Sequence, residues 1–250
     1  MSGHSKWSTI KHKKGAADAK RGRMFTVLAR AITMAAKEGG GDMDVNFGLR
    51  LAVEKAKRAN MPKDNIDRAT KRGTGEDKDA AAFEKLIYEC YAPNGIALIV
   101  EAVTDNSNRT VADLRHVLNK AGGNVGETGS VSWQFTQKAY FAFSPKGHDE
   151  DVIYMLAADA GADDVEFSKD VIEIYGQPKD FKKISDQLRL AGIKTEEADL
   201  RMFPNQEIEL DVDKTLTVMK VIDSLEDLDD INQVDSNMAI TDAALEKLMA

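Results

Sequence analysis

The chain has 250 residues, of which 42% are hydrophobic and 30% are charged. This length favours more than one domain, because a domain usually takes about 100–200 residues, and the composition excludes collagen-like and wholly disordered chains. The net charge of −8 is unevenly divided: residues 1–78 carry 18 basic and 9 acidic side chains, a net +9, whereas residues 79–250 carry 16 and 33, a net −17.

Residues 1–20 show no apolar periodicity, which predicts a basic arm that orders when it binds a partner. The first 30 residues carry Asp18 against eight basic side chains: Lys6, Lys11, Lys13, Lys14, Lys20, Arg21, Arg23 and Arg30. Lys and Arg can neutralise phosphates, and a tryptophan face can stack on a base. We therefore predict a nucleic-acid contact made by Lys6, Trp7, Lys11, His12, Lys13, Lys14, Lys20, Arg21 and Arg23. A solvated tail is the alternative interpretation.

Three helices are predicted after the arm. Helical periodicity runs from Asp18 to the glycines at 39–41, Asn46 can cap a second helix, and Pro62 suits the first turn of a third that ends at Gly73. They form a domain of residues 1–78. Eight basic side chains of the second and third helices extend the positive surface: Arg50, Lys55, Lys57, Arg58, Lys63, Arg68, Lys71 and Arg72. We expect about half of them to form helix-surface ion pairs instead. No base-reading helix-turn-helix pattern is present, so sequence-specific recognition is not predicted.

The periodicity then changes to strands and helices. Strands at 86–91 and 96–104 flank a turn. A helix then follows, for which Asp105, Asn106 and Ser107 are all N-cap candidates, and it ends at the glycines 122–123. The glycine-rich stretch 122–130 lacks the Gly-Lys-Ser/Thr ending of a phosphate-binding loop and follows a helix, so we interpret it as a helix stop and a turn.

A complete β-α-β-β-α-β unit follows in residues 130–204, with strands at 139–144, 164–168, 171–175 and 194–202 and helices at 149–160 and 178–191. This order is typical of ferredoxin-like domains. A strand at 207–212, a helix at 213–225 and a strand at 229–234 would complete the interrupted unit before it. The predicted fold class is therefore α/β (α+β): a three-helix domain, 1–78, then a discontinuous domain, 79–129 and 205–250, with a second ferredoxin-like domain, 130–204, inserted in it.

No constellation for catalysis or metal binding is evident. The four histidines are dispersed, and the single cysteine, Cys90, is better explained by packing than as a nucleophile. The densest acidic cluster is interpreted as a solvated face: Asp223, Glu226, Asp227, Asp229 and Asp230. We expect no enzyme activity, cofactor or metal. The lack of a secretion signal or membrane-spanning stretch predicts a cytoplasmic location.

Five separated motifs occur in order along nearly the whole chain. They are Gly3-His4-Ser5-Lys6-Trp7, the stretch from Lys11-His12-Lys13-Lys14 to Asp18-Ala19-Lys20-Arg21-Gly22, Asn60-Met61-Pro62-Lys63-Asp64-Asn65-Ile66, Tyr88-Glu89 through Tyr91-Ala92-Pro93, and Gly122-Gly123-Asn124 to Gly129-Ser130-Val131. With these motifs the chain resembles the YebC family. The resemblance implies a helical domain plus two α/β domains, and a DNA-binding transcriptional regulator.

The family resemblance leaves a second function open, since other members are linked to ribosomes, to the activation of translation and to the relief of stalls at proline-rich sequences. The partner would then be ribosomal RNA or transfer RNA rather than DNA. An enzyme and a pure scaffold are further alternatives. Cys90, Ala92 and Asn94 stand where glycines are expected in family hairpins, which weakens the expectation of a special backbone geometry at that turn.

Overall fold

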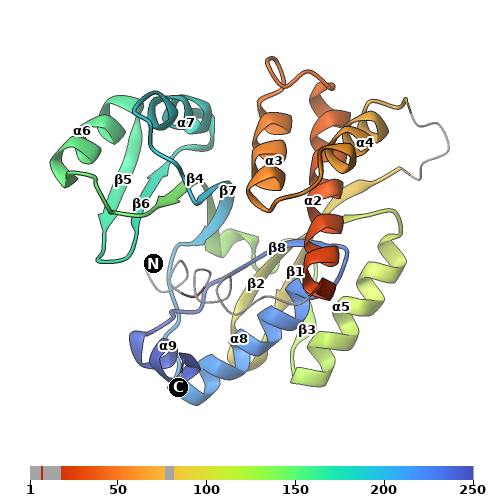
Figure 1. Ribbon diagram of the computed structural model, residues 1–250. Coiled ribbons are helices and arrows are strands. Elements are labelled where there is room, and N and C mark those ends of the chain that lie inside the picture. The colour runs from red at the N-terminus through yellow and green to blue at the C-terminus, as the bar shows by residue number, and fades with distance from the viewer. Residues whose placement is uncertain (1–6, 8–17, 77–81, 250) are drawn as a thin grey trace. The chain divides into compact units, whose positions relative to one another are not determined.

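The computed structural model describes Trp7 and residues 18–76 and 82–249 (Figure 1). The described chain divides into two compact units. The first, which we call the helix–sheet unit, comprises residues 18–132 and 217–234. The second, the ferredoxin-like unit, comprises residues 133–216 and 235–249, and Trp7 is grouped with it.

The helix–sheet unit begins with three packed helices, as the sequence predicts: α2 (Asp18–Gly39), α3 (Phe47–Arg58) and α4 (Lys63–Gly73). The Asn46 side chain caps α3 by accepting from the backbone N–H of Leu49, at 3.0 Å. Its amide nitrogen donates to the carbonyl oxygens of Ala35 and Gly40, both at 2.7 Å. One side chain therefore fixes both the end of α2 and the start of α3.

The three helices share an apolar core to which each contributes buried residues, among them Ile32, Leu49 and Ile66. Helix α4 ends very close to α2. A Cβ atom built on Gly73 would lie 2.3 Å from the carbonyl oxygen of Thr33 and 2.6 Å from the Cβ of Ala36. The approach of the two helices therefore requires glycine at this position.

A four-stranded sheet with order β3-β1-β2-β8 forms the rest of the helix–sheet unit. Its strands are β1 (Glu84–Tyr91), β2 (Ala97–Thr104), β3 (Asn124–Val125) and β8 (Ile231–Ser236). The helices α5 (Ser107–Ala121) and α8 (Val212–Glu226) connect its parts in sequence, and most of α8 and β8 belongs to this unit. The sequence predicts these elements to within a few residues, except β3, which lies in the stretch interpreted as a turn.

The β1–β2 turn does require a special backbone geometry. Asn94 has φ 65° and Gly95 has φ 75° within the 3-10 turn Pro93–Gly95. The expectation that asparagine weakens this requirement is wrong, because asparagine tolerates the left-handed region better than most residues.

The ferredoxin-like unit has a sheet of order β5-β6-β4-β7 in which all pairings are antiparallel. The strands are β4 (Phe135–Phe143), β5 (Ala162–Phe167), β6 (Ile172–Gly176) and β7 (Glu197–Pro204). The helices α6 (Glu150–Ala160) and α7 (Phe181–Leu190) lie side by side (Figure 1). Two short 3-10 turns, Ser132–Gln134 and Pro178–Asp180, precede β4 and α7. This is the order of a ferredoxin-like split βαβ domain.

The two faces of this sheet differ in chemistry. Phe141 packs on Phe181 of α7, with ring centroids 4.7 Å apart. On alternate residues, the hydroxyls of Tyr140 and Tyr175 both donate to the buried carboxylate of Glu173, at 2.9 and 3.1 Å. Burial of the phenol, followed by the charge of Glu173, raises the pKa of Tyr175. These groups satisfy one another's hydrogen bonds.

The strand predicted at 207–212 is wrong. Only a single parallel bridge forms there, between Ile208 and Met238. The Asp211 side chain instead accepts from the backbone N–H of Lys214, at 2.9 Å, and so caps α8. Because the cap at Asp211 starts α8 at Val212, the residues before it do not form a strand. A final helix, α9 (Asp242–Met249), is also absent from the sequence prediction.

The mixed α/β fold class is confirmed: helices first, then two four-stranded sheets, with β4 to β7 inserted in sequence between β3 and β8. The three predicted domain ranges stay a prediction, since the compact units group the three helices with the first sheet. No helix in the part of the chain described here is long and apolar enough to cross a membrane.

Replacement of Gly73 by alanine should destabilise the protein. The added methyl group meets backbone and Cβ atoms of α2 that cannot rotate away, and overpacking of this kind costs about 1–3 kcal/mol. Gly22→Ala is the matched control, because a Cβ there has nothing within 4 Å; it should be neutral or stabilising by up to about 1 kcal/mol. Urea denaturation measures both, and equal stability of the two variants would contradict the close approach.

Candidate nucleic-acid interface

The predicted arm lies mostly outside the described residues, namely Lys6, Lys11, His12, Lys13 and Lys14. Lys20 and Arg21 lie in the first turns of α2, and their side chains are not described. The side chain of Trp7 is 8% exposed. Its indole is therefore not an open surface on which a base could stack in this structure.

Arg23 is engaged by acidic groups of its own unit. Its guanidinium lies 3.0 Å from a carboxylate oxygen of Asp227 and 3.5 Å from one of Asp229, and it donates to the carbonyl oxygen of Glu226. Its side chain is 21% exposed. The role of Arg23 as a phosphate ligand stays a prediction, and in this structure its terminal nitrogens are bonded to Asp227 and to the carbonyl oxygen of Glu226.

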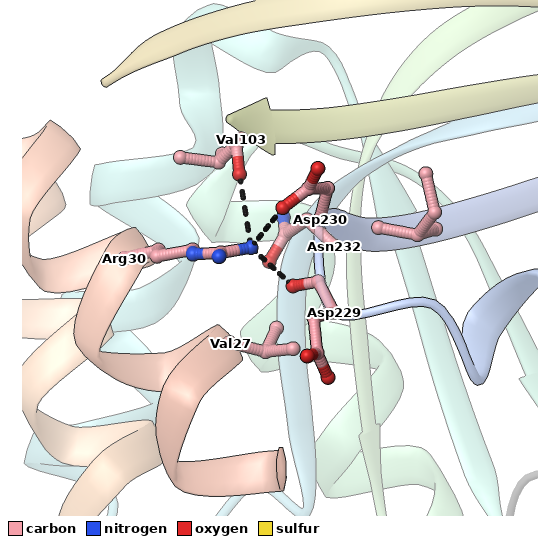
Figure 2. A pocket seen from close by; sticks show the side chains of 7 residues that line it. Val27, Arg30, Val103, Asp229, Asp230 and Asn232 are labelled. Carbon is pink, nitrogen blue, oxygen red and sulfur yellow. Dashed lines mark hydrogen bonds and ion pairs between the residues drawn. The ribbon is translucent and has the colours of Figure 1, made fainter. Parts of the chain in front are cut away.

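Arg30, about two turns further along the same face of α2, is less exposed, with 14% of its side chain accessible. Figure 2 shows its side chain extending from α2 toward the segment before β8. One terminal nitrogen lies 2.6 Å from the carboxylate of Asp230 and also donates to the carbonyl oxygens of Asp229 and Val103. Arg30 and these acceptors line a small hollow together with Val27 and Ile231 (Figure 2).

Asp230 collects further donors from the sheet and from α5. Its oxygens accept from the hydroxyls of Thr104, at 3.1 Å, and Thr110, at 2.8 Å, and from two nitrogens of Arg109. The Asp230 side chain is 5% exposed. Burial alone would raise its pKa, but hydrogen bonds from Thr110 and Arg109, the charge of Arg30 and the hydrogen bond from Thr104 together lower the pKa below its usual 3.8.

The acidic cluster at 223–230 is therefore not simply the solvated face that the sequence predicts. Asp230 joins α2, α5 and the end of β2 through hydrogen bonds. Asp227 and Asp229 form ion pairs with Arg23. No local signal separates Asp230 from its acidic neighbours, because the arginines and threonines that surround it come from distant parts of the sequence.

Two more basic residues are used internally, around Phe83. The Lys37 ammonium donates to the carbonyl oxygen of Phe83 at 2.9 Å, and the Arg72 guanidinium lies 4.2 Å from the centre of the Phe83 ring. Such contacts hold the three helices near the start of β1. They leave fewer cations available to a partner than the sequence count suggests.

Four basic side chains remain exposed on α3 and α4, with no ion pair to any carboxylate among the described residues: Lys57, Lys63, Arg68 and Lys71. They are four of the eight basic side chains of which about half are predicted to form helix-surface pairs. The two helices together carry eight basic and three acidic side chains, a net +5. Lys57, Lys63, Arg68 and Lys71 thus form an exposed cationic surface, which we call the α3–α4 surface.

The glycine-rich stretch is ordered by one carboxylate. Glu89 of β1 accepts from the backbone N–H groups of Gly129, Val131 and Ser132, at 2.6 to 2.8 Å. Burial would raise the pKa of Glu89, but these hydrogen bonds lower it. The loop N–H groups are thus already bonded to an internal anion and do not form an open phosphate cradle.

Cys90 beside it fits the packing role that its sequence context indicates. It is fully buried, and burial, with a smaller effect of the Glu89 charge, raises the pKa of its thiol to about 12. A thiol this rarely ionised is a poor nucleophile at neutral pH. Within residues 18–76 and 82–249 no group of three or more His, Cys, Asp or Glu side chains could hold a metal ion.

Replacement of Asp230 by asparagine should cost about 3–5 kcal/mol of stability, because Arg30 and Arg109 would lose a buried carboxylate. Asp227→Asn is the matched control: that carboxylate is 63% exposed, so its loss should cost less than about 1 kcal/mol. Equal effects of the two variants on urea denaturation would contradict the central role of Asp230.

The stability loss caused by Asp230→Asn should depend on pH. A carboxylate with a lowered pKa stabilises the folded state above its unfolded pKa, and that contribution disappears as pH falls through the folded pKa. The stability difference between the wild type and Asp230→Asn should therefore be constant near neutral pH and shrink only below the usual aspartate pKa of 3.8. Urea titrations at several pH values measure it.

Known protein families and a solved structure are similar to this chain over most of its length. A family model described as the TACO1/YebC protein N-terminal domain matches residues 5–76, and one described as the TACO1/YebC second and third domain matches residues 83–238. A crystal structure of a conserved hypothetical protein from Aquifex aeolicus superimposes with a TM-score of 0.85 and 40% identity, covering 93% of this chain and 96% of that chain.

Full-length relatives carry regulatory names. A probable transcriptional regulatory protein of Geotalea uraniireducens is 48% identical over 249 residues, which is 100% of both chains. One of Desulforapulum autotrophicum is 48% identical over 242 residues, 97% of this chain and 98% of that one. Two family models that together cover most of the chain, and relatives of this identity over its full length, show that the chain belongs to the TACO1/YebC family.

Proposed function

We propose that this protein is a non-enzymatic, cytoplasmic regulator of transcription that binds DNA through its phosphates. The observation that carries the proposal is the α3–α4 surface, where Lys57, Lys63, Arg68 and Lys71 are exposed and have no ion pair among the described residues. Flexible cations without internal partners can neutralise phosphates and release counterions. The basic arm would add to this surface.

The internal ion pairs support a specific division of labour among the basic residues. Arg23 and Arg30 contact acidic groups, and Lys37 and Arg72 contact Phe83, so these four serve the fold. The exposed cations remain for a partner. Because residues 79–250 carry a net −17, the remainder of the chain favours no polyanion and would limit contact to the basic part.

The relatives' names support the regulatory part of the proposal, since they are called probable transcriptional regulatory proteins. The chemistry of the surface supports binding that depends little on sequence. Phosphate contacts position a protein on nucleic acid, whereas base-edge contacts specify a sequence. We therefore expect modest sequence preference and strong salt dependence.

Neutralisation of the α3–α4 surface should weaken nucleic-acid binding. The variant Lys57→Gln, Lys63→Gln, Arg68→Gln, Lys71→Gln should bind duplex DNA less tightly, and each lost phosphate contact should reduce the log–log salt slope by about 0.9. Fluorescence anisotropy over a salt series measures both quantities. The matched control removes four exposed lysines of the ferredoxin-like unit, Lys146, Lys169, Lys179 and Lys182, each replaced by Gln. Equal losses in the two variants would refute the proposed surface.

Neutralisation of the arm tests its contribution separately. Replacement of Lys11, Lys13, Lys14, Lys20 and Arg21 by Gln should lower the affinity and the salt slope further, because the arm carries most of the charge of the first 30 residues. The same titrations with ribosomal RNA distinguish the two partners. Tighter binding to ribosomal RNA than to duplex DNA, with co-sedimentation on ribosomes, would replace the transcriptional proposal by the translational alternative.

A further inference from the structure

The outward face of α6 in the ferredoxin-like unit carries large apolar side chains that nothing in that unit covers. Val152 is 60% exposed, Tyr154 is 58% exposed and Met155 is 67% exposed, whereas Ile153, Ala157 and Ala160 form the buried side of the same helix. Single exposed apolar residues are common, but Val152 and Met155 are three positions apart and therefore neighbours on the helix surface, with Tyr154 on the other flank of Met155. Exposed apolar patches mark interaction sites.

Met155 lies at the centre of this patch, because it is opposite the buried side of the helix. Positions three and four residues apart are neighbours on a helix surface. Asp151 and Val152 therefore lie one turn before Met155, and Ala158 and Asp159 lie one turn after it. The flexible, polarisable side chain of methionine is well suited to binding surfaces that accept varied partners. The centre is apolar and both ends are acidic.

The surroundings of the patch have one sign of charge. Residues 149–166 contain seven acidic side chains and no lysine or arginine. Lys183 of α7 approaches this segment, but it donates to the backbone carbonyl oxygen of Asp159, at 3.0 Å. The fold accounts for part of the acidity: Asp149 caps α6 by accepting from the N–H groups of Asp151 and Val152. It does not account for the exposed Val152, Tyr154 and Met155.

We propose that this face of α6 binds a basic amphipathic helix of a partner protein. Apolar residues of that helix would cover Met155, Val152 and Tyr154, and its lysines or arginines would lie beside Asp151 and Asp159. The charge disfavours other occupants: nucleic acid and anionic lipid would be repelled, and a second copy would bring two sets of carboxylates together. The inference does not depend on the α3–α4 surface, which lies in the other unit.

The test is isothermal titration of the full-length protein with a synthetic amphipathic helix of lysine and leucine. Two control peptides separate the forces: a lysine–serine peptide keeps the charge without the apolar face, and a glutamate–leucine peptide keeps the apolar face with the opposite charge. We expect the lysine–leucine peptide to bind and both controls to bind at least about tenfold more weakly, a difference of about 1.4 kcal/mol.

Two pairs of variants locate the site. Met155→Lys should weaken binding of the lysine–leucine peptide at least tenfold, whereas Leu190→Lys, at an equally exposed apolar position on α7, should leave it unchanged. Asp151→Asn with Asp159→Asn should weaken it, whereas Asp170→Asn with Glu209→Gln, which removes the same charge from exposed positions elsewhere in the unit, should not. Circular dichroism confirms that each variant is folded.

Each contrary outcome overturns the proposal. Equal binding of the lysine–serine peptide would indicate simple charge attraction, and equal binding of the glutamate–leucine peptide would indicate nonspecific apolar contact. Binding that survives Met155→Lys would place the site elsewhere. Absence of binding, or self-association through α6 detected by sedimentation and abolished by Met155→Lys, would replace the partner helix by no ligand or by a second copy.

Discussion

The helix–sheet unit depends on the charge of one buried carboxylate. Asp230 accepts hydrogen bonds from Arg30 of α2, from Arg109 and Thr110 of α5 and from Thr104 at the end of β2. A buried charge is tolerated only when it is paired and hydrogen-bonded. Loss of Asp230 would therefore leave the charge of Arg30 uncompensated, and loss of the donors would leave the Asp230 carboxylate buried without partners. Because the donors come from separate elements, this cluster joins α2 and α5 to the sheet.

The ion pairs of the 226–230 segment also determine which basic residues of α2 are available to bind a partner. Counting charge along the sequence treats every lysine and arginine alike, but among the described residues the fold separates two groups. Arg23 and Arg30 of α2 are paired with the 226–230 segment, whereas Lys57, Lys63, Arg68 and Lys71 of α3 and α4 have no ion pair to a described carboxylate. Net charge predicts the kind of partner, and the internal ion pairs determine where on the described surface it can bind.

Local signals explain why most elements could be predicted. Asn46 caps α3 as predicted, the cap of α5 is Asn106, one of three predicted candidates, and Asp149 caps α6 where that helix is predicted to start. Glycines end α5 and α6 in the left-handed conformation. Errors arise where a helix-capping residue competes with strand-like periodicity. At Asp211 the cap starts α8, and the strand predicted at 207–212 does not form. The role of Asp230 could not be predicted, because its burial depends on four side chains that are distant in sequence. The exposed face of α6 was missed for a related reason: periodicity identifies a helix but not which apolar residues the fold leaves uncovered.

The position of Asp230 also constrains how the protein is made. It lies 200 positions after Arg30, and an entire second sheet is inserted between them. Synthesis proceeds from the amino terminus, so the three helices leave the ribosome long before their carboxylate exists. Contacts of such long sequence separation form late and slow folding. The contacts of Asp230 can therefore form only after residue 230 has left the ribosome, and a chain that terminates before it leaves Arg30 and Arg109 without their shared counter-ion.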